Sequence, residues 1–371
     1  FHTLHWSIPM LPKSFLPFSD AASNQLPLVR LLQLSLFQVS VGIGVVLLVG
    51  TLNRIMIVEL GVSAAIVAMM VALPLLVAPF RAFVGFRSDT YKSVLGWRRV
   101  PFIWVGSLLQ FGGLCIMPFA LILLSGDTHW PLWIGPLSAG LAFLLVGMGV
   151  QTVQTAGLAL ATDLSPDLNK PRVVALMYTM LLLGMVISSL VISFLLEPFS
   201  QVRLIQVIQG TALICFLLNL VALWKQEPRN VVLTSPKKQS PSFWFCWKKF
   251  SKTPNTKRFL LALGVGTAAF SMQDVILEPY GGEILKLSVS ETTLLTAYST
   301  CGSIISFGFA AWFLKTNINS HRIAGLGAVL GILAFSFVVL SEPMASIFLF
   351  TLGVFLIGCG AGFFSVSCLI S

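Results

Sequence analysis

Residues 31–53 read LLQLSLFQVSVGIGVVLLVGTLN, and no charged side chain interrupts them between Arg30 and Arg54. An α-helix of about 20 residues spans the hydrocarbon core of a bilayer, which is about 30 Å thick. The stretch is therefore long and apolar enough to cross a membrane as a helix. It lacks the alternation of apolar and polar side chains that is typical of a transmembrane β-strand.

The same pattern recurs along the whole chain. Further uncharged runs occupy residues 60–80, 100–126, 128–162, 173–196, 204–224, 292–314, 323–341 and 343–371. One more run begins at Phe259 and is interrupted by Asp274 and Glu278. We therefore predict an all-α polytopic membrane protein with ten spanning helices.

The composition of the 371 residues agrees with this prediction. Hydrophobic residues make up 56% of the chain, charged residues only 10%, and the mean hydropathy is +0.92. Soluble globular domains carry about 25% charged residues, which they need to cover a surface facing water. The composition thus excludes a soluble enzyme, a nucleic-acid-binding domain and a disordered tail.

The basic residues predict the orientation of the chain in the membrane. Lys and Arg concentrate in the cytoplasmic loops of membrane proteins. With the N-terminus in the cytoplasm, 20 of the 23 basic residues lie on that side, and only Arg54, Arg203 and Lys286 lie on the other. The net charge of +10 is then explained by topology, without a nucleic-acid partner.

A polar segment divides the chain after six of the predicted helices. We expect an N-terminal cytoplasmic tail (1–26), a six-helix bundle (27–224), a cytoplasmic linker (225–257) and a second bundle (258–371). Two such halves are typical of transporters that are built from parallel repeats. A repeat of six plus six would give twelve helices, so we expect two further helices beyond the ten, lost by truncation or disorder at the C-terminus.

The linker contains Phe243-Trp244-Phe245-Cys246-Trp247-Lys248-Lys249-Phe250, which combines aromatic and basic side chains. This segment predicts either a helix at the level of the lipid headgroups or a solvated basic loop. His2 and His5 in the N-terminal tail could bind a pigment or a metal, although an ordinary tail is the simpler interpretation.

Charged residues of both signs gather in two loops on the predicted cytoplasmic side. Gly85 and Asp89 precede Arg98 and Arg99, and the second loop runs from Asp163 to Arg172. We predict that Asp89 and Asp163 each approach Arg98, Arg99 or Arg172, and that Asp89 can also accept hydrogen bonds from the start of a neighbouring helix. The first loop resembles the signature of the major facilitator superfamily, which implies a two-bundle fold.

The most unusual stretch is Met272-Gln273-Asp274-Val275-Ile276-Leu277-Glu278-Pro279-Tyr280-Gly281-Gly282. Asp274 and Glu278 lie four residues apart and so share one helix face inside the membrane, where a carboxylate must be protonated, paired or directed at a polar cavity. Pro279 and the glycines are expected to end or bend the helix and to free carbonyl groups. We predict that Arg54 pairs with Glu278, while Asp274 faces the interior with Gln273 beside it. Cargo binding and a purely structural ion pair both remain open, with Tyr280 as a further candidate.

Several strings of this sequence resemble the PucC/LhaA family, the bacteriochlorophyll-delivery branch of the major facilitator superfamily, and the LhaA type most closely. They include Gln273–Gly282, Gly50–Leu60, Ala78–Arg81, Ser93–Pro101 and Gln154–Leu164. The resemblance implies a bacterial inner-membrane assembly factor that handles bacteriochlorophyll, with carotenoid as a further pigment. The implied partners are core light-harvesting antenna polypeptides, the reaction centre and membrane lipid, with pigment-synthesis enzymes left open.

If a bacteriochlorophyll magnesium is bound within the membrane, oxygen ligands are expected, because no histidine lies deep in a predicted span: His129 is only the second residue of the run 128–162, and His2, His5 and His321 lie outside the runs. The intramembrane amides besides Gln273 are Gln38, Gln110, Gln151, Gln154 and Asn219. Hydrogen bonding between helices is the simpler role for each of them.

Two other function classes compete with the assembly factor. A proton-coupled transporter of a small solute would use Asp274 or Glu278 as its proton site. A pigment-modifying enzyme is disfavoured, because the sequence shows no cluster of metal ligands, no dinucleotide glycine motif and no nucleophile beside a base. The six cysteines form no Cys-x-x-Cys pair and are interpreted as packing residues, so no metal site or disulfide is expected.

Overall fold

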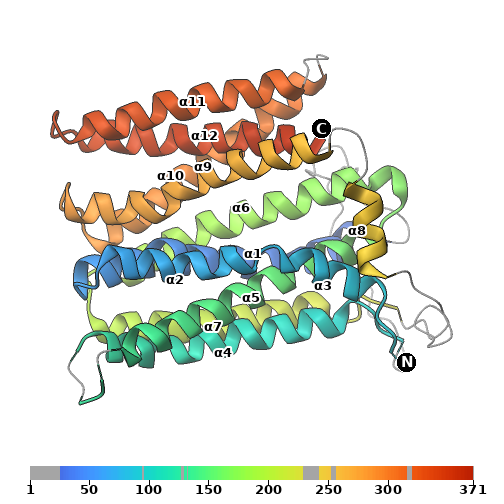
Figure 1. Ribbon diagram of the computed structural model, residues 1–371, viewed down its shortest axis with the longest axis horizontal. Helices are drawn as coiled ribbons and strands as arrows, with labels where there is room; N and C mark the ends of the chain where they lie inside the picture. Colours follow the sequence, from blue (N-terminus) through green and yellow to red (C-terminus); the bar gives the residue numbers. More distant parts are fainter. Residues whose placement is uncertain are drawn as a thin grey trace, which may run out of the picture.

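The computed structural model describes residues 26–93, 96–126, 129–131, 133–228, 242–251, 256–315 and 320–370. These residues form helices that run roughly parallel to one another, apart from one short helix across the end of the bundle (Figure 1). Ten helical stretches are long and apolar enough to cross a membrane. The predicted number of spans is therefore confirmed for the described residues.

The elements of the first half are α1 (Leu28–Val45), the π-helical segments η3 (Val46–Leu52) and η4 (Ile55–Glu59), α2 (Ala64–Val77), α3 (Phe80–Asp89), α4 (Val100–Leu124), α5 (Ile134–Asp163), the short 3₁₀ helix η5 (Asp167–Asn169), α6 (Lys170–Leu195) and α7 (Gln201–Leu223). Those that follow are α8 (Phe243–Ser251), α9 (Thr256–Glu283), α10 (Val289–Lys315), α11 (Ser320–Ser341) and α12 (Ile347–Ile370).

The apolar core is divided between the two halves of the chain. Most buried apolar side chains of residues 26–223 form one continuous cluster, and those of residues 277–366 form two smaller clusters. Within the halves, α4 packs along α5 and α11 packs along α12, and the halves meet mainly where α6 packs along α10. Large apolar side chains such as Phe119, Phe194 and Ile332 are exposed on the outside, as expected of helices that face lipid.

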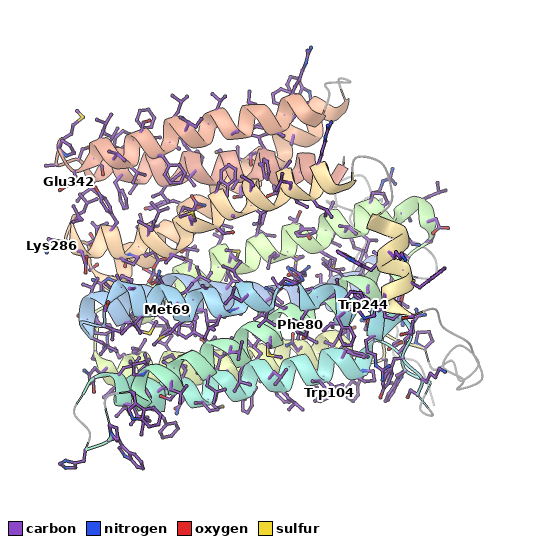
Figure 2. The ribbon with its side chains drawn as sticks, viewed as in Figure 1. Met69, Phe80, Trp104, Trp244, Lys286 and Glu342 are labelled. Atoms are coloured by element: carbon purple, nitrogen blue, oxygen red, sulfur yellow. The ribbon has the colours of Figure 1, made fainter. Side chains whose placement is uncertain are left out.

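The two ends of the bundle differ in composition, and we name them by their residues. The basic end carries the loop from Thr90 to Arg99 and helix α8, whereas the far end carries Glu59, Lys286 and Glu342. Figure 2 shows Lys286 and Glu342 at one end of the molecule and Trp244 at the other.

The aromatic segment of the linker forms a helix, α8, so the solvated-loop interpretation is wrong for these residues. Its first ring, Phe243, packs edge-on against Phe83 and Phe86 of α3, with ring centroids 6.1 and 5.5 Å apart. Trp244 and Phe245 are 73% and 66% exposed. Helix α8 therefore lies across the basic end with apolar rings uncovered (Figure 1). The N-terminal tail with His2 and His5 lies outside the described residues.

The first span is the longest, from Leu28 to Glu59, and it changes its winding partway along. After α1 the backbone widens into η3 and η4. Such π-helical turns are rare and occur frequently at functional sites. They place Gly50, Asn53 and Arg54 against the second half of the chain.

Candidate functional site

The contact between the first span and α9 depends on Pro279. A proline has no backbone N–H, so it cannot bond to the carbonyl four residues before it, which here is that of Val275. The helix nevertheless continues through Pro279 to Glu283, so of the expected end or bend of the helix, the end is wrong. The carbonyl oxygen of Val275 accepts a hydrogen bond of 2.9 Å from Nδ2 of Asn53. A polar side chain of one half thus replaces the missing backbone donor of the other.

Arg54 forms its ion pair with Glu59, and the predicted pair with Glu278 is wrong. The prediction assumed α-helical winding, in which residues five apart do not face each other. In a π-helix the backbone hydrogen bonds run from i to i+5, so residues at this spacing are stacked neighbours. The guanidinium also donates from Nη2 to the carbonyl oxygen of Leu287, at 3.1 Å. Arg54 is only 3% exposed and therefore joins the two halves while its charge is balanced within its own helix.

Glu278 lies at nearly the same depth as Arg54 but has a neutral partner. Its Oε1 accepts a hydrogen bond of 2.5 Å from Oγ1 of Thr296 on α10, and the residue is 4% exposed. It also lies against Gly50, where an added Cβ atom would overlap the carboxylate and displace it. Glu278 and Gly50 both line a small cavity of about 90 Å³ between the halves.

The neighbours of Glu278 in the sequence have separate surroundings. Gln273 is 6% exposed, and its Oε1 atom accepts no hydrogen bond from a described residue. The hydroxyl of Tyr280 donates to Oε2 of Glu342 at 3.4 Å. The side chain of Asp274 lies outside the described part of the structure, so its predicted direction is not tested.

A row of hydroxyl groups joins α6 to α10. The hydroxyl of Ser193 donates to the carbonyl oxygen of Ser290 at 3.0 Å, and the two Oγ atoms are 2.8 Å apart. One turn nearer the centre, Ser189 donates to the carbonyl oxygen of Thr293, whose hydroxyl lies 3.4 Å from that of Thr51. The serines and threonines are nearly fully buried. Helices in lipid pack closely through such small polar residues.

The described hydrogen bonds between the two halves lie toward the far end. They comprise the Asn53 and Arg54 contacts, the hydroxyl row and a bond of 3.2 Å from Ser290 to Glu197. At the basic end, the described hydrogen bonds stay within the first half and the start of the linker. These contacts therefore hold the two halves together toward the far end.

The largest cavity among those described is a groove of about 700 Å³ on the side of the first bundle. Its walls are α1, α6 and α7, and its lining is mostly aliphatic. Ile187, Val191 and Phe194 at its edge are at least half exposed, so the groove opens sideways. Glu197, Arg203 and Gln206 supply polar groups at its end nearest the far end. Concave, mostly apolar sites of this size with a few polar groups are typical of small-molecule binding.

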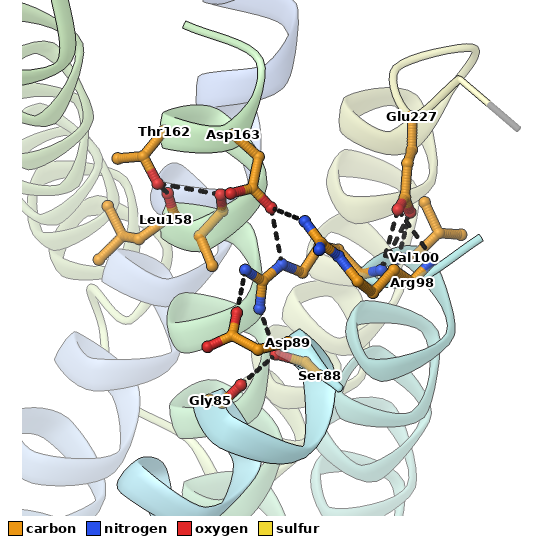
Figure 3. A network of polar contacts seen from close by, with 11 residues as sticks. Gly85, Ser88, Asp89, Arg98, Val100, Leu158, Thr162, Asp163 and Glu227 are labelled. Carbon is orange, nitrogen blue, oxygen red and sulfur yellow. Dashed lines mark hydrogen bonds and ion pairs between the residues drawn. The ribbon is translucent and has the colours of Figure 1, made fainter. Parts of the chain in front are cut away.

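The contacts predicted for Asp89 and Asp163 are present at the basic end (Figure 3). Oδ2 of Asp163 accepts from Arg98 at 2.7 Å and from Arg99 at 3.0 Å, and Arg99 also pairs with Asp89. Arg99 is 4% exposed, so its charge requires these partners. Arg172 lies in the first turn of α6, and the described ion pairs of the two aspartates run to Arg98 and Arg99.

Glu227 completes this rim, and the sequence analysis missed it. Its carboxylate accepts from the backbone N–H groups of Arg98, Arg99 and Val100 at 2.8 to 3.1 Å, at the start of α4. A carboxylate at this position satisfies unpaired donors and the positive end of the helix dipole. The sequence predicts this role for Asp89, which pairs with Arg99 instead.

Ser88 adds a neutral contact to the same rim. Its hydroxyl accepts a bond of 2.6 Å from Arg99 and donates to the carbonyl of Gly85 at 2.8 Å. Gly85 thus contributes its backbone oxygen to the network that holds Arg99.

Two of the intramembrane amides join helices to each other. Gln110 on α4 donates to the carbonyl oxygen of Ser40 on α1 at 3.2 Å. Gln154 on α5 accepts from Nη2 of Arg81 on α3 at 2.9 Å. These contacts fit the simpler interpretation, in which the amides hold helices together.

The remaining amides have buried polar atoms that make no hydrogen bond to a described residue. These atoms are the side-chain nitrogen and oxygen of Gln38 and of Asn219, and Oε1 of Gln151. Gln151 also lines a cavity of about 160 Å³ between α1, α2, α5 and α9. Of these three amides, Gln151 is therefore the one that borders a described cavity.

The comparisons with known proteins agree on one family. A family model described as "PUCC protein" matches residues 51–371. Protein PucC of Rhodovulum sulfidophilum is 53% identical over 95% of this chain and 79% of its own length, and that of Cereibacter sphaeroides is 51% identical over 95% and 77%. The "Bacteriochlorophyll synthase 44.5 kDa chain" of Rhodobacter capsulatus is 27% identical over 82% and 70%.

Solved transporter structures share the fold at low sequence identity. The nucleoside transporter NupG is 16% identical, with a TM-score of 0.62 over 91% of this chain and 80% of its own. A bacterial homologue of the iron transporter ferroportin in the inward-facing state is 19% identical, with a TM-score of 0.60 over 92% and 83%. The predicted two-bundle, major-facilitator-like fold is thus confirmed, and the matched family model together with the PucC relatives shows that the chain belongs to the PUCC protein family.

Proposed function

We propose that this protein is a non-enzymatic membrane assembly factor that binds bacteriochlorophyll, or delivers it, to light-harvesting antenna polypeptides around the photosynthetic reaction centre. The family supports a role in antenna assembly, and a relative's name refers to bacteriochlorophyll. Carotenoid is a second candidate cargo. The ten apolar spans and the bacterial relatives support a bacterial inner-membrane location, and the 20-to-3 asymmetry of basic residues supports an N-terminus in the cytoplasm.

The lateral groove is the observation that carries this proposal. Its volume of about 700 Å³ and its aliphatic walls suit a large apolar ring system or its hydrocarbon tail. At its polar end, Glu197 and Gln206 offer side-chain oxygens, the donors that magnesium prefers. The cavity beside Gln151, at about 160 Å³, is much smaller. The volume, the lining and the polar end of the groove together support pigment binding on the side of the first bundle.

The proposal is tested by filling the groove. Gly210 lines it, and a Cβ atom added at Gly210 would meet no other atom within 4 Å. The Cβ atom of Gly210→Trp therefore has room, and its indole ring should fill part of the groove and weaken the binding of bacteriochlorophyll about tenfold or more, which is about 1.4 kcal/mol. The measurement is pigment absorbance of the purified protein after incubation with bacteriochlorophyll.

Gly112→Trp on α4 is the matched control, because a Cβ atom at Gly112 also meets open space and Gly112 lines none of the described cavities. It should bind pigment as the unmodified chain does. A wild-type protein that stays colourless would count against the proposal, as would equal pigment loads in the two variants.

The second candidate function is a proton-coupled transporter of a small solute. Glu278 favours it, because a buried carboxylate with a threonine partner in a small cavity between two halves suits a proton site. This function predicts proton-coupled uptake into liposomes that Glu278→Gln abolishes. Such uptake by a colourless protein would replace the assembly factor as the preferred function.

A further inference from the structure

Arg81 is a charged residue inside the second span whose described partners are all neutral. Its Nε donates to Oγ1 of Thr155 at 3.1 Å and its Nη2 to Oε1 of Gln154 at 2.9 Å. Among the described ionisable groups, the phenol of Tyr178 on α6 interacts electrostatically with Arg81. No described carboxylate pairs with this guanidinium, unlike those of Arg54, Arg98 and Arg99.

The geometry leaves part of the guanidinium available. Arg81 is half-buried. Its Nη1 atom donates none of the described hydrogen bonds, and this atom is not one of the buried polar atoms that lack a partner. The two bonds to α5 hold the planar group in a fixed orientation. A guanidinium held in this way presents paired donors that match the two oxygens of a carboxylate or phosphate.

Arg81 lies within electrostatic range of a helix that contacts the second half. Its hydrogen-bond partners lie on α5, Tyr178 of α6 acts on it electrostatically, and α6 packs along α10 of the second half. The described hydrogen bonds between the halves lie toward the far end, whereas Arg81 lies in α3, the part of the second span nearest the basic end. A cavity that opens toward the basic end would therefore expose this guanidinium to an entering molecule.

We propose that Arg81 is an anion-binding residue that recognises the carboxylate or phosphate of an amphipathic molecule entering from the basic end. Gln154 and Thr155 are positioning residues that orient the guanidinium without neutralising it. A charge with neutral partners inside a membrane protein is costly, and an anionic ligand would offset that cost. The inference goes beyond the proposed function, because bacteriochlorophyll is esterified and carries no free carboxylate. Arg81 would recognise a free-acid tetrapyrrole or another amphipathic anion and would not discriminate for the esterified pigment.

The test uses matched acidic and esterified probes on the full chain in lipid nanodiscs. Binding of protoporphyrin, which carries two free carboxylates, is compared with binding of its dimethyl ester by quenching of tryptophan fluorescence, with empty nanodiscs subtracted. Arg81→Gln should weaken binding of the acid about tenfold or more and leave binding of the ester unchanged. Arg81→Lys should retain part of the affinity, because lysine keeps the charge but loses the paired donors.

Arg87→Gln is the matched control, because Arg87 is exposed on the same helix, α3. It should leave both probes unaffected. Equal binding of the acid by the wild type and Arg81→Gln would overturn the inference, and so would equal weakening of acid and ester. If Arg81→Gln fails to fold, the ratio of acid to ester affinity in the wild type and Arg81→Lys decides the question.

A spin-labelled fatty acid and its methyl ester separate this inference from the proposed function. A wild type that binds neither porphyrin but binds the fatty acid through Arg81 would reject the pigment function and keep the anion site. A protein whose binding of bacteriochlorophyll depends on Gly210, and whose binding of both free acids is unchanged in Arg81→Gln, would reject the anion site and keep the pigment function.

Discussion

Pro279 and Asn53, which are far apart in the sequence, act on the same backbone group, the carbonyl of Val275. Pro279 deprives the carbonyl of Val275 of its helical donor, and Asn53 of the other half supplies a replacement at 2.9 Å. A buried carbonyl without a donor costs about 1–3 kcal/mol. The bond therefore stabilises the contact between the halves more than a typical surface hydrogen bond would.

Asn53→Leu should lower the free energy of unfolding by about 1–3 kcal/mol, because it leaves the carbonyl of Val275 unpaired. Adding Pro279→Ala restores a backbone donor within α9, so the double variant should be more stable than Asn53→Leu alone. Thermal unfolding in detergent measures both effects. Additive losses in the double variant would show that the two residues do not serve the same carbonyl.

At the scale of elements, the seam between α6 and α10 differs from the other helix contacts in its chemistry. Four small hydroxyl-bearing residues, two on each helix, meet there in pairs. Hydroxyl contacts of this kind are individually weak in membranes, of the order of 1 kcal/mol, and they do not lock the helices in one register as large interlocking side chains would. The seam is thus suited to opening and closing.

Ser193→Cys combined with Ser290→Cys should form a disulfide under mild oxidation, because the two Oγ atoms are 2.8 Å apart. The halves should then stay linked after proteolysis at a site introduced between them. If cargo handling requires separation of the halves at the far end, the cross-linked protein should lose antenna assembly and regain it on reduction. The single cysteine variants are the controls, and full activity of the oxidised double variant would exclude such separation.

The sequence predicts the spans well and the polar contacts unevenly. Uncharged runs between charged residues define helices, because the bilayer imposes their length. The rim contact of Asp163 with Arg98 and Arg99 was also predictable, since both signs of charge gather in neighbouring loops. The partner of Arg54 was not, because the π-helical winding of η4 decides it and no residue type signals that winding. Glu227 reaches the start of α4 only through the packing of α7.

At the scale of the whole molecule, the charged residues divide the protein into two unlike ends. Helix α8, with Lys248, lies across the basic end, whereas Lys286 lies in the loop between α9 and α10 at the far end (Figure 2). The basic asymmetry predicts that the basic end faces the cytoplasm. The two lysines mark opposite faces of the membrane in that arrangement.

Labelling with a membrane-impermeant thiol reagent tests this orientation. In a chain without its six native cysteines, Lys286→Cys should react from the periplasmic side of intact cells, whereas Lys248→Cys and Lys237→Cys should react only after the cells are opened. Lys286→Cys serves as the control for expression and reactivity. Reaction of Lys248→Cys in intact cells would reverse the assigned orientation.

The confinement of the described inter-half hydrogen bonds to one end has a mechanical consequence. Ser193 of the hydroxyl row lies 23 residues from Lys170, the first residue of α6, which is about 35 Å along the helix. If the hydroxyl row acts as the fulcrum, a rotation of about 10° moves that end of α6 by about 6 Å. Atoms in van der Waals contact are about 3.5–4 Å apart, so a gap of that width admits a flat ring system edge-on. A small rotation of the two halves about a few serines would thus open a gap at the opposite end that is wide enough for a large planar molecule.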